Sequence, residues 1–125
     1  MRSPTQTPDD DAVDEIVEGL LRFVDSVVLP IETQHAALLN DARRVYDERG
    51  ALTPEVRRLK AEVRTRSAQA GYYTMFAPAS VDGGGYGAYV LYRTWEALHR
   101  RYGPGRMLPY ASLAHWSSGP SVLCA

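Results

Sequence analysis

Apolar residues recur at intervals of three and four in segment after segment of this chain, and no window alternates apolar and polar residues cleanly over five or more positions. A spacing of three and four places side chains on one face of an α-helix, whereas a half-buried strand needs a spacing of two. Proline and glycine interrupt the pattern where helices typically begin and end. A chain of 125 residues is about the length of one domain. The sequence therefore predicts an all-α domain of five or six helices.

The first helix is expected after residues 1–8, a polar segment with two prolines that we expect to be disordered. Residues 9–11, all aspartates, supply capping oxygens and negative charge at the helix start. The apolar stripe that follows consists of Ile16, Val17, Leu20, Leu21, Val24, Val27 and Val28. Leu29 and Pro30 are expected to end this helix, because a residue before proline is pushed out of the helical region.

Two more helices are expected in the middle of the chain. The second runs from Pro30 to Gly50, where the glycine would provide a left-handed cap. Its apolar face consists of Ile31, His35, Leu38, Ala42 and Val45. Residues 53–55, Thr-Pro-Glu, indicate the start of the third helix with a hydroxyl cap, a first-turn proline and an acid against the helix dipole. Gly71 is expected to close this helix, whose apolar face consists of Val56, Leu59, Val63 and Ala70.

The last third of the chain begins with an expected extended link at residues 72–78 and a loop at residues 83–87, Gly-Gly-Gly-Tyr-Gly. A fourth helix should stop at residues 103–105, Gly-Pro-Gly. Its apolar face consists of Leu91, Trp95, Leu98 and Tyr102. Residues 107–118 are nearly free of charge and rich in small and aromatic residues, so we expect a buried helix there.

The end of the chain interrupts a pattern. Gly119 and Pro120 should start a new helix, but the last five residues carry no polar tail and no helix cap. We therefore expect residues 9–125 to be a domain that is cut at its C-terminal end.

Charge and cysteine content restrict the class of function. Lys and Arg number 14 and Asp and Glu 15, and the net charge of −1 argues against a nucleic-acid or anionic-membrane surface. The single cysteine, Cys124, excludes an internal disulfide, and three scattered histidines show no metal-site spacing. Neither a signal peptide nor a run near the roughly 18 apolar residues of a membrane span is present. We expect a soluble protein in a reducing cytoplasm.

Two features invite a catalytic interpretation, and each lacks residues that the chemistry requires. The glycine run at 83–87 is not spaced as G-x-G-x-x-G, and no strand pattern precedes it. His99 and His115 lie near several serines, but no G-x-S-x-G elbow or acid partner accompanies them. We therefore assign no catalytic, cofactor-binding or metal-binding residue to this chain.

A series of short motifs carries more information than any one of them. In order along the chain they are Val-Leu-Pro-Ile-Glu at 28–32, Ala-Gly at 70–71, Phe-Ala-Pro at 76–78, Gly-Gly-Tyr-Gly at 84–87, Trp-Glu-Ala-Leu at 95–98 and Arg-Tyr-Gly at 101–103. Their order and spacing, from about residue 13 to the end, resemble the N-terminal domain of acyl-CoA dehydrogenases. The fold that this resemblance implies is an orthogonal bundle of five to six helices.

The resemblance implies an activity for a longer parent protein. Members of the family use FAD, and a glutamate takes the α-proton of an acyl-CoA thioester while a hydride passes to the flavin. The flavin site and this glutamate belong to a middle β-domain and a C-terminal helical domain, which this chain lacks. The parent would be a homo-oligomer that passes electrons to an electron-transfer flavoprotein. Its N-terminal domain forms part of the wall of the acyl pocket and an inter-domain face.

Three residues are expected at that wall if residues 102–103 and Pro120 are matched to the family. They are Leu108, Ser112 and Trp116, at a spacing of four, and a tryptophan there would shorten the pocket. Ordinary core packing is the alternative for all three. The alternative function is a free-standing helical module that binds a partner protein or a CoA-type ligand through the aromatic residues around its glycine loop.

Overall fold

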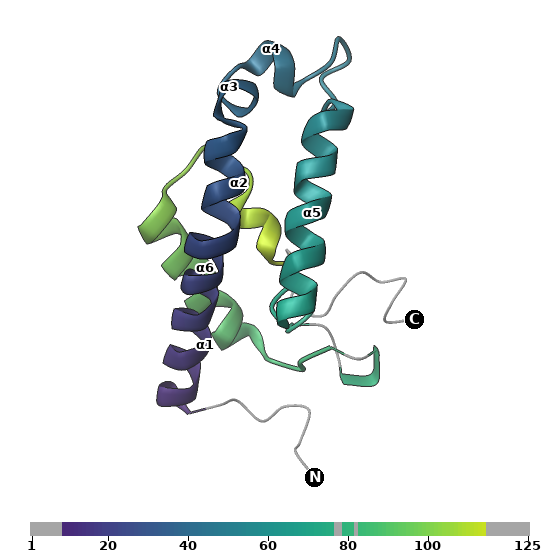
Figure 1. The fold of residues 1–125 in the computed structure, drawn as a ribbon. Helices are drawn as coiled ribbons and strands as arrows, with labels where there is room; N and C mark the ends of the chain where they lie inside the picture. The colour runs from purple at the N-terminus through teal and green to yellow at the C-terminus, as the bar shows by residue number, and fades with distance from the viewer. Residues whose placement is uncertain (1–8, 77–78, 82, 115–125) are drawn as a thin grey trace.

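The computed structural model describes residues 9–76, 79–81 and 83–114, and this part of the chain is helical (Figure 1). One isolated antiparallel bridge, between Tyr46 and Leu52, is the only β-type pairing among these residues. The expected all-α bundle is confirmed. The expected disordered tail at 1–8 and the expected helix start at Gly119 and Pro120 lie outside the described residues.

The N-terminal quarter of the fold is one long helical rod. It consists of α1 (Asp10–Phe23), the π-helical turn η1 (Val24–Val28) and α2 (Leu29–Gln34). The carboxylate of Asp9 caps α1, as expected, by accepting a hydrogen bond from the Ala12 N–H at 2.8 Å.

The prediction that the first helix ends at Leu29 and Pro30 is wrong. The N–H of Leu29 donates to the carbonyl of Val24, five residues back, so the chain makes one wide turn immediately before the proline. A π-turn of this kind accommodates the missing proline N–H and the bulk of its ring, which would otherwise interrupt the ladder of hydrogen bonds.

The prediction of one helix from Pro30 to Gly50 is also wrong. After α2, the chain forms two short helices, α3 (Ala36–Leu39) and α4 (Ala42–Val45). Aspartates that follow α3 and α4 accept hydrogen bonds from nearby backbone N–H groups: Asp41 from residue 43, and Asp47 from residues 49 and 51. These local bonds satisfy the backbone in turns and so compete with a continuous helix. Gly50 has the expected positive φ of 79°, but within a turn.

Helix α5 (Pro54–Ala70) matches its predicted bounds, and Gly71 closes it with a φ of 93°. Two details differ from expectation. The Thr53 hydroxyl does not cap the helix, because it donates to the Arg44 carbonyl at 2.8 Å. Ala70 is exposed, and Ser67 is the last buried residue of the helix after the three predicted ones.

The 3-10 turn η2 (Ala79–Val81) precedes α6 (Ala88–Tyr102), which stops at Gly103 as predicted. The buried face of α6 includes Leu98 and Tyr102, but Leu91 and Trp95 are only half-buried. Val90 and Thr94, each one position earlier in the sequence, are buried instead. The buried face in the first half of α6 is therefore shifted by one residue from the predicted face.

The predicted helix at 107–118 is replaced, over its described part, by the 3-10 turn η3 (Pro109–Ser112) and then by Leu113 in extended conformation. The expected burial of this segment is confirmed for Leu108, Ala111 and Leu113. Pro109 at the start favours one tight turn, and the following backbone leaves the helical region before an α-helical ladder forms.

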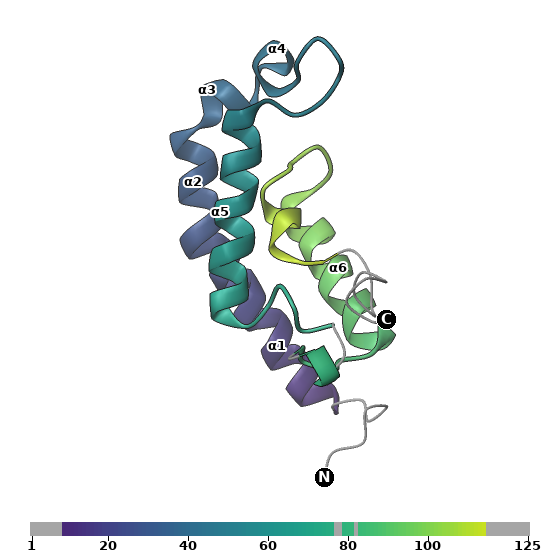
Figure 2. The same cartoon turned by 90° about the vertical axis from the view of Figure 1, so that its right-hand side faces the viewer.

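Figures 1 and 2 show α5 beside α2 and running in the opposite direction, with α3 and α4 at their common end. Helix α6 lies along α1 instead, and cross-links show that the two run in the same direction: Asp10 bonds Tyr89, Asp14 bonds Arg93, and Asp25 bonds Arg101. One apolar cluster lies between these helices and η3. The long rod therefore packs beside α6 at its α1 end and beside α5 at its α2 end.

Candidate functional site

The predicted pocket residues lie in the core in the described part of the chain. Leu108 is fully buried, and so is Ser112. The Ser112 hydroxyl donates to the Pro109 carbonyl at 2.6 Å, and the Ser112 carbonyl accepts from the Ser67 hydroxyl at 2.5 Å. Trp116 lies outside the described residues. The Ser67 hydroxyl therefore joins α5 to η3, whereas the Ser112 hydroxyl bonds within η3, and the lining of an acyl pocket stays a prediction.

The glycine loop is a backbone crossing. The Gly84 N–H donates to the Thr74 carbonyl and the Tyr86 N–H to the Met75 carbonyl, both at 3.1 Å. A Cβ atom on Gly84 would lie 2.7 Å from the Met75 carbonyl oxygen, closer than backbone permits. Two N–H groups of the loop are thus already bonded within the chain, which argues against a phosphate cradle here.

His99 belongs to an aromatic cluster. Its Nδ1 lies 2.8 Å from the Trp95 carbonyl oxygen, and its ring stacks on Tyr110 with 4.6 Å between centroids. The stacking on Tyr110 packs η3 against α6, whereas the contact with Trp95 lies within α6. His115 lies outside the described residues. No group of three or more His, Cys, Asp or Glu that could hold a metal ion occurs in the described part of the chain.

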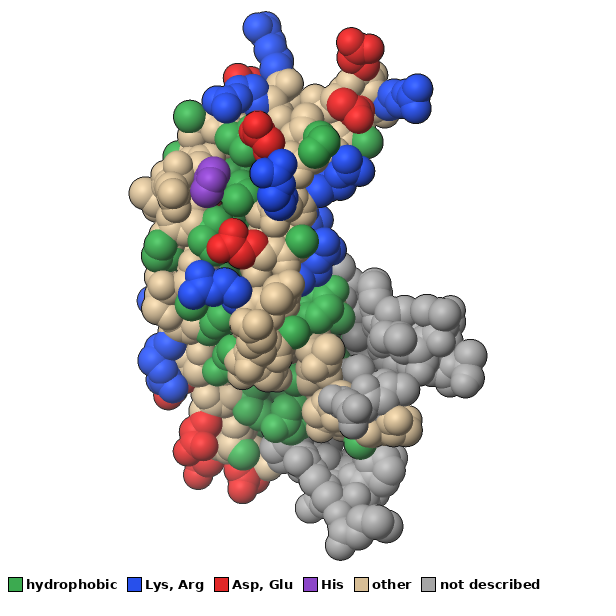
Figure 3. Space-filling view, turned by 45° about the vertical axis from the view of Figure 1, so that its right-hand side comes forward, with side chains coloured by type: hydrophobic (Ala, Val, Ile, Leu, Met, Phe, Trp, Pro, Cys, Tyr) green, Lys and Arg blue, Asp and Glu red, His purple; other side chains and the backbone are tan. Residues whose placement is uncertain are grey.

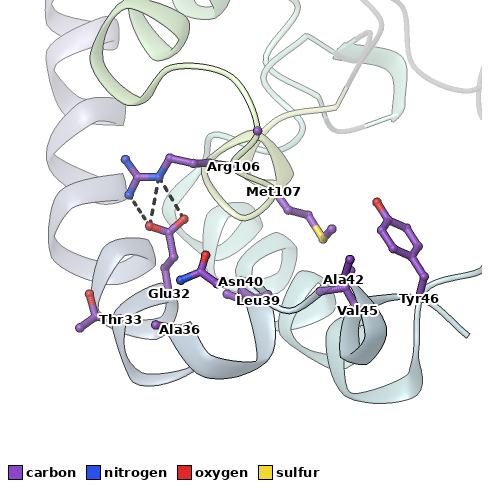
Figure 4. A pocket seen from close by; sticks show the side chains of 11 residues that line it. Glu32, Thr33, Ala36, Leu39, Asn40, Ala42, Val45, Tyr46, Arg106 and Met107 are labelled. Carbon is purple, nitrogen blue, oxygen red and sulfur yellow. Dashed lines mark hydrogen bonds and ion pairs between the residues drawn. The ribbon is translucent and has the colours of Figure 1, made fainter.

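A groove of about 600 Å³, which the sequence did not predict, lies between two parts of the fold (Figure 4). Helices α2 to α4 form one wall, and the segment between α6 and η3 forms the other. The lining residues are Glu32, Thr33, Ala36, Leu39, Asn40, Ala42, Val45, Tyr46, Gly105, Arg106 and Met107.

An ion pair closes one end of the groove. The Arg106 Nε lies 3.1 and 3.2 Å from the two carboxylate oxygens of Glu32, and a terminal guanidinium nitrogen also bonds the carboxylate. The Glu32 carboxylate raises the pKa of Arg106 above its usual value. The guanidinium also lies 5.6 Å from the ring centroid of Tyr102. Both charges are therefore satisfied within the protein, and Glu32 is not free to act as a base.

The rest of the groove is apolar apart from three polar side chains, Thr33, Asn40 and Tyr46. Leu39, Val45 and Met107 supply the apolar surface, and the Asn40 side chain lies between them and the ion pair (Figure 4). Tyr46 is 48% exposed at the far end. This arrangement can hold an elongated molecule with a hydrogen-bonding end, but it offers no nucleophile or free acid–base pair.

The contact between η1 and α6 holds two groups with shifted pKa values, Asp25 and Tyr102. Hydrogen bonding by Arg101 lowers the pKa of the Asp25 carboxyl, and Tyr102 adds to this effect. Burial raises the pKa of Tyr102 to about 12, and its hydrogen bond to Asp25 contributes in the same direction. The polar groups of Asp25, Arg101 and Tyr102 bond one another, so this cluster stabilises the packing of the helices.

Comparison of the chain with models of protein families, with curated proteins and with solved structures found no match. None of the described helices is long and apolar enough to cross a membrane.

Proposed function

We propose that this chain is the N-terminal helical domain of an FAD-dependent acyl-CoA dehydrogenase, in which it forms part of the acyl-pocket wall and an inter-domain face. The order of the six motifs between residues 28 and 103 carries the proposal. The all-helical bundle is the fold class that such a domain requires.

The structural roles of the motif residues support the proposal. Glu32 holds Arg106 across the groove, Gly71 ends α5 with a positive φ, and Gly84 permits the backbone crossing at Met75. Phe76 is 1% exposed in the core. Proteins that share a fold need the same structural residues in the same order along the chain. A match at such residues is therefore stronger support for a shared fold than a match at exposed residues.

The described residues do not fit a flavin site by themselves. The glycine loop uses two of its N–H groups internally, and the Glu32–Arg106 pair is already mutually satisfied. We therefore derive no flavin chemistry from this chain. Its role in the parent would be to exclude water and shape the space for the acyl chain, in a setting of low polarity that favours proton and hydride transfer.

The coding sequence beyond Ala125 provides the first test. We expect it to continue in frame into a β-rich segment and a helical bundle with a candidate glutamate base. The encoded full product should bind FAD, and acyl-CoA thioesters should bleach its flavin absorbance in the absence of oxygen. An in-frame stop codon directly after Ala125, or a full product that binds no flavin, would overturn the proposal.

The pocket residues can be tested in the same product. Trp116→Ala should shift the preferred substrate toward longer acyl-CoA thioesters, because the removed indole would leave room for more methylene groups. Tyr92→Ala, which removes an exposed ring from α6, is the matched control and should leave chain-length preference unchanged.

One observation favours the alternative, a free-standing helical module that binds a partner protein or a CoA-type ligand. The groove between α2–α4 and residues 105–107 is open to a ligand without any further domain. Titration of the purified 125-residue chain with acyl-CoA thioesters distinguishes the two. Saturable binding that Met107→Trp abolishes, and a stop codon after Ala125, would favour the module.

A further inference from the structure

The ionic contacts of this molecule are distributed unevenly. Every ion pair among the described residues uses a cation from α6 or from Arg106, which follows it. Helix α5 carries five basic and two acidic residues, and none of them has an ion-pair partner in the described part of the chain. Among the described residues, the charges of α5 therefore form no ion pair.

The basic residues of α5 divide into two flanks of the helix. Arg58 and Arg66 share one flank with Glu55 and Glu62, so this flank is neutral. Arg57, Lys60 and Arg64 lie on the other flank, where the remaining residues are small and no acid occurs. We call these three residues the basic stripe. Figure 3 shows Lys and Arg side chains along one edge of the upper half of the molecule.

Helix α1 carries the opposite charge. Asp10 and Asp14 face α6, where they bond Tyr89 and Arg93. The remaining acids, Asp11, Glu15 and Glu18, lie on the side of α1 turned away from the core, and all three are exposed. We call them the acidic stripe; no ion pair involves them within the described chain.

The two stripes are complementary in spacing as well as in charge. The acidic stripe has steps of four and three residues, at 11, 15 and 18. The basic stripe has the same steps when it is followed backwards, at 64, 60 and 57. The first and last residues of each stripe are seven positions apart, or about 10 Å along a helix. Antiparallel alignment therefore places Asp11 opposite Arg64, Glu15 opposite Lys60, and Glu18 opposite Arg57.

We propose that the acidic stripe of α1 docks on the basic stripe of α5 in a second copy of this chain. The net charge of −1 creates little general repulsion between copies. An antiparallel contact also brings opposite ends of the two helix dipoles together. Five of the six residues are exposed and Lys60 is half-buried, so the contact is screened by solvent, forms at low ionic strength and weakens with added salt. This contact does not depend on the function proposed above.

Sedimentation equilibrium of the 125-residue chain at low salt tests the contact, with a charge-reversal cycle at its central pair. Glu15→Lys and Lys60→Glu should each raise the dissociation constant of self-association by about tenfold, since each places like charges opposite one another. The double variant Glu15→Lys, Lys60→Glu restores opposite charges and the wild-type net charge, so it should return to within about twofold of wild type.

A matched control tests the register. The variant Glu15→Lys, Arg58→Glu has the same net charge, but its second change lies on the neutral flank of α5, so it should remain as weak as Glu15→Lys alone. The proposal is overturned if the wild-type chain is monomeric at low salt, or if this control restores association as well as the central pair does. Circular dichroism of each variant should show unchanged helix content.

Discussion

Helices α1 and α6 are joined by residues that are far apart in the sequence, whereas residues 36–52, which we call the tip, are held by near neighbours. Tyr89 reaches Asp10 and Arg93 reaches Asp14 across 79 positions. In the tip, Asp47 bonds N–H groups two and four residues away. Only the first kind of contact ties the tertiary fold together, so the same type of bond has different consequences in the two regions.

Truncation of apolar side chains should give the largest difference in stability between the α1–α6 pair and the tip. Leu20→Ala on the buried side of α1 should lower the free energy of unfolding by about 2–5 kcal/mol, because it leaves a cavity under α6. Leu39→Ala, at a half-buried position of α3, should cost about 1 kcal/mol. Urea unfolding of both variants checks this order. Equal losses would mean that the tip belongs to the same cooperative unit as the α1–α6 pair.

A smaller loss of stability is expected at the ion pair between Glu32 of α2 and Arg106, which follows α6. Glu32→Gln should destabilise by about 1–2 kcal/mol, because Arg106 keeps its charge without a carboxylate partner. The control is Glu96→Gln in the exposed pair with Arg100, where the expected cost is below about 0.5 kcal/mol. Thermal unfolding measures both. A larger loss for Glu96→Gln would contradict our account of the groove.

The pH dependence of stability should come from the α1–α6 pair. The lowered pKa of Asp25 contributes stability that is present above the unfolded-state value of about 3.9 and is lost as the pH falls through the folded-state pKa. Asp25→Asn should therefore flatten the acid limb of a plot of urea midpoint against pH. Asp47→Asn in the tip is the control, and an equal flattening there would contradict this assignment.

Tyr102 acts at the opposite end of the pH scale. Its raised pKa of about 12 contributes stability that is present below the unfolded-state value of about 10 and is lost as the pH rises through about 12. Tyr102→Phe should remove this alkaline dependence while keeping the ring in the core. Urea midpoints across the alkaline range check the result; an unchanged alkaline limb would show that another group controls it.

The smallest effect should be confined to the tip. Asp47→Ala removes an acceptor for the N–H groups of Arg49 and Ala51, at a cost of about 0.5 kcal/mol. Hydrogen exchange should accelerate at residues 49–52 and remain unchanged in α1 and α6. Acceleration in α6 would mean that the tip and the α1–α6 pair open together.

The contrast between local and long-range contacts also explains which features the sequence predicts well. Helix ends that glycine and proline determine locally were predicted correctly, as at Pro54, Gly71 and Gly103. The continuation through Pro30 was missed because a π-turn has no simple residue signature. The breaks in the tip were missed because the apolar spacing of three and four was weighed above Asp41 and Asp47, whose side chains bond the turns.

The candidate site was less accessible from sequence than the fold. The Glu32–Arg106 pair spans 74 positions, and no local pattern indicates which of 14 basic residues a given acid will meet. The groove depends on this pair and on the break of the expected second helix into α3 and α4. The burial predicted for residues 107–118 from their composition is confirmed at Leu108 and Ser112, whereas the pocket role predicted for these two residues stays a prediction.

The parallel alignment of α1 and α6 has a consequence for how the chain folds. A helical hairpin pairs neighbours soon after both are made, but α1 meets α6 only after about 80 intervening residues. During synthesis, the apolar face of α1 therefore leaves the ribosome well before α6, which packs against it. A nascent chain that ends before α6 would expose Val13, Leu20 and Val24 to other proteins, so α1 is the segment that a chaperone would be expected to hold.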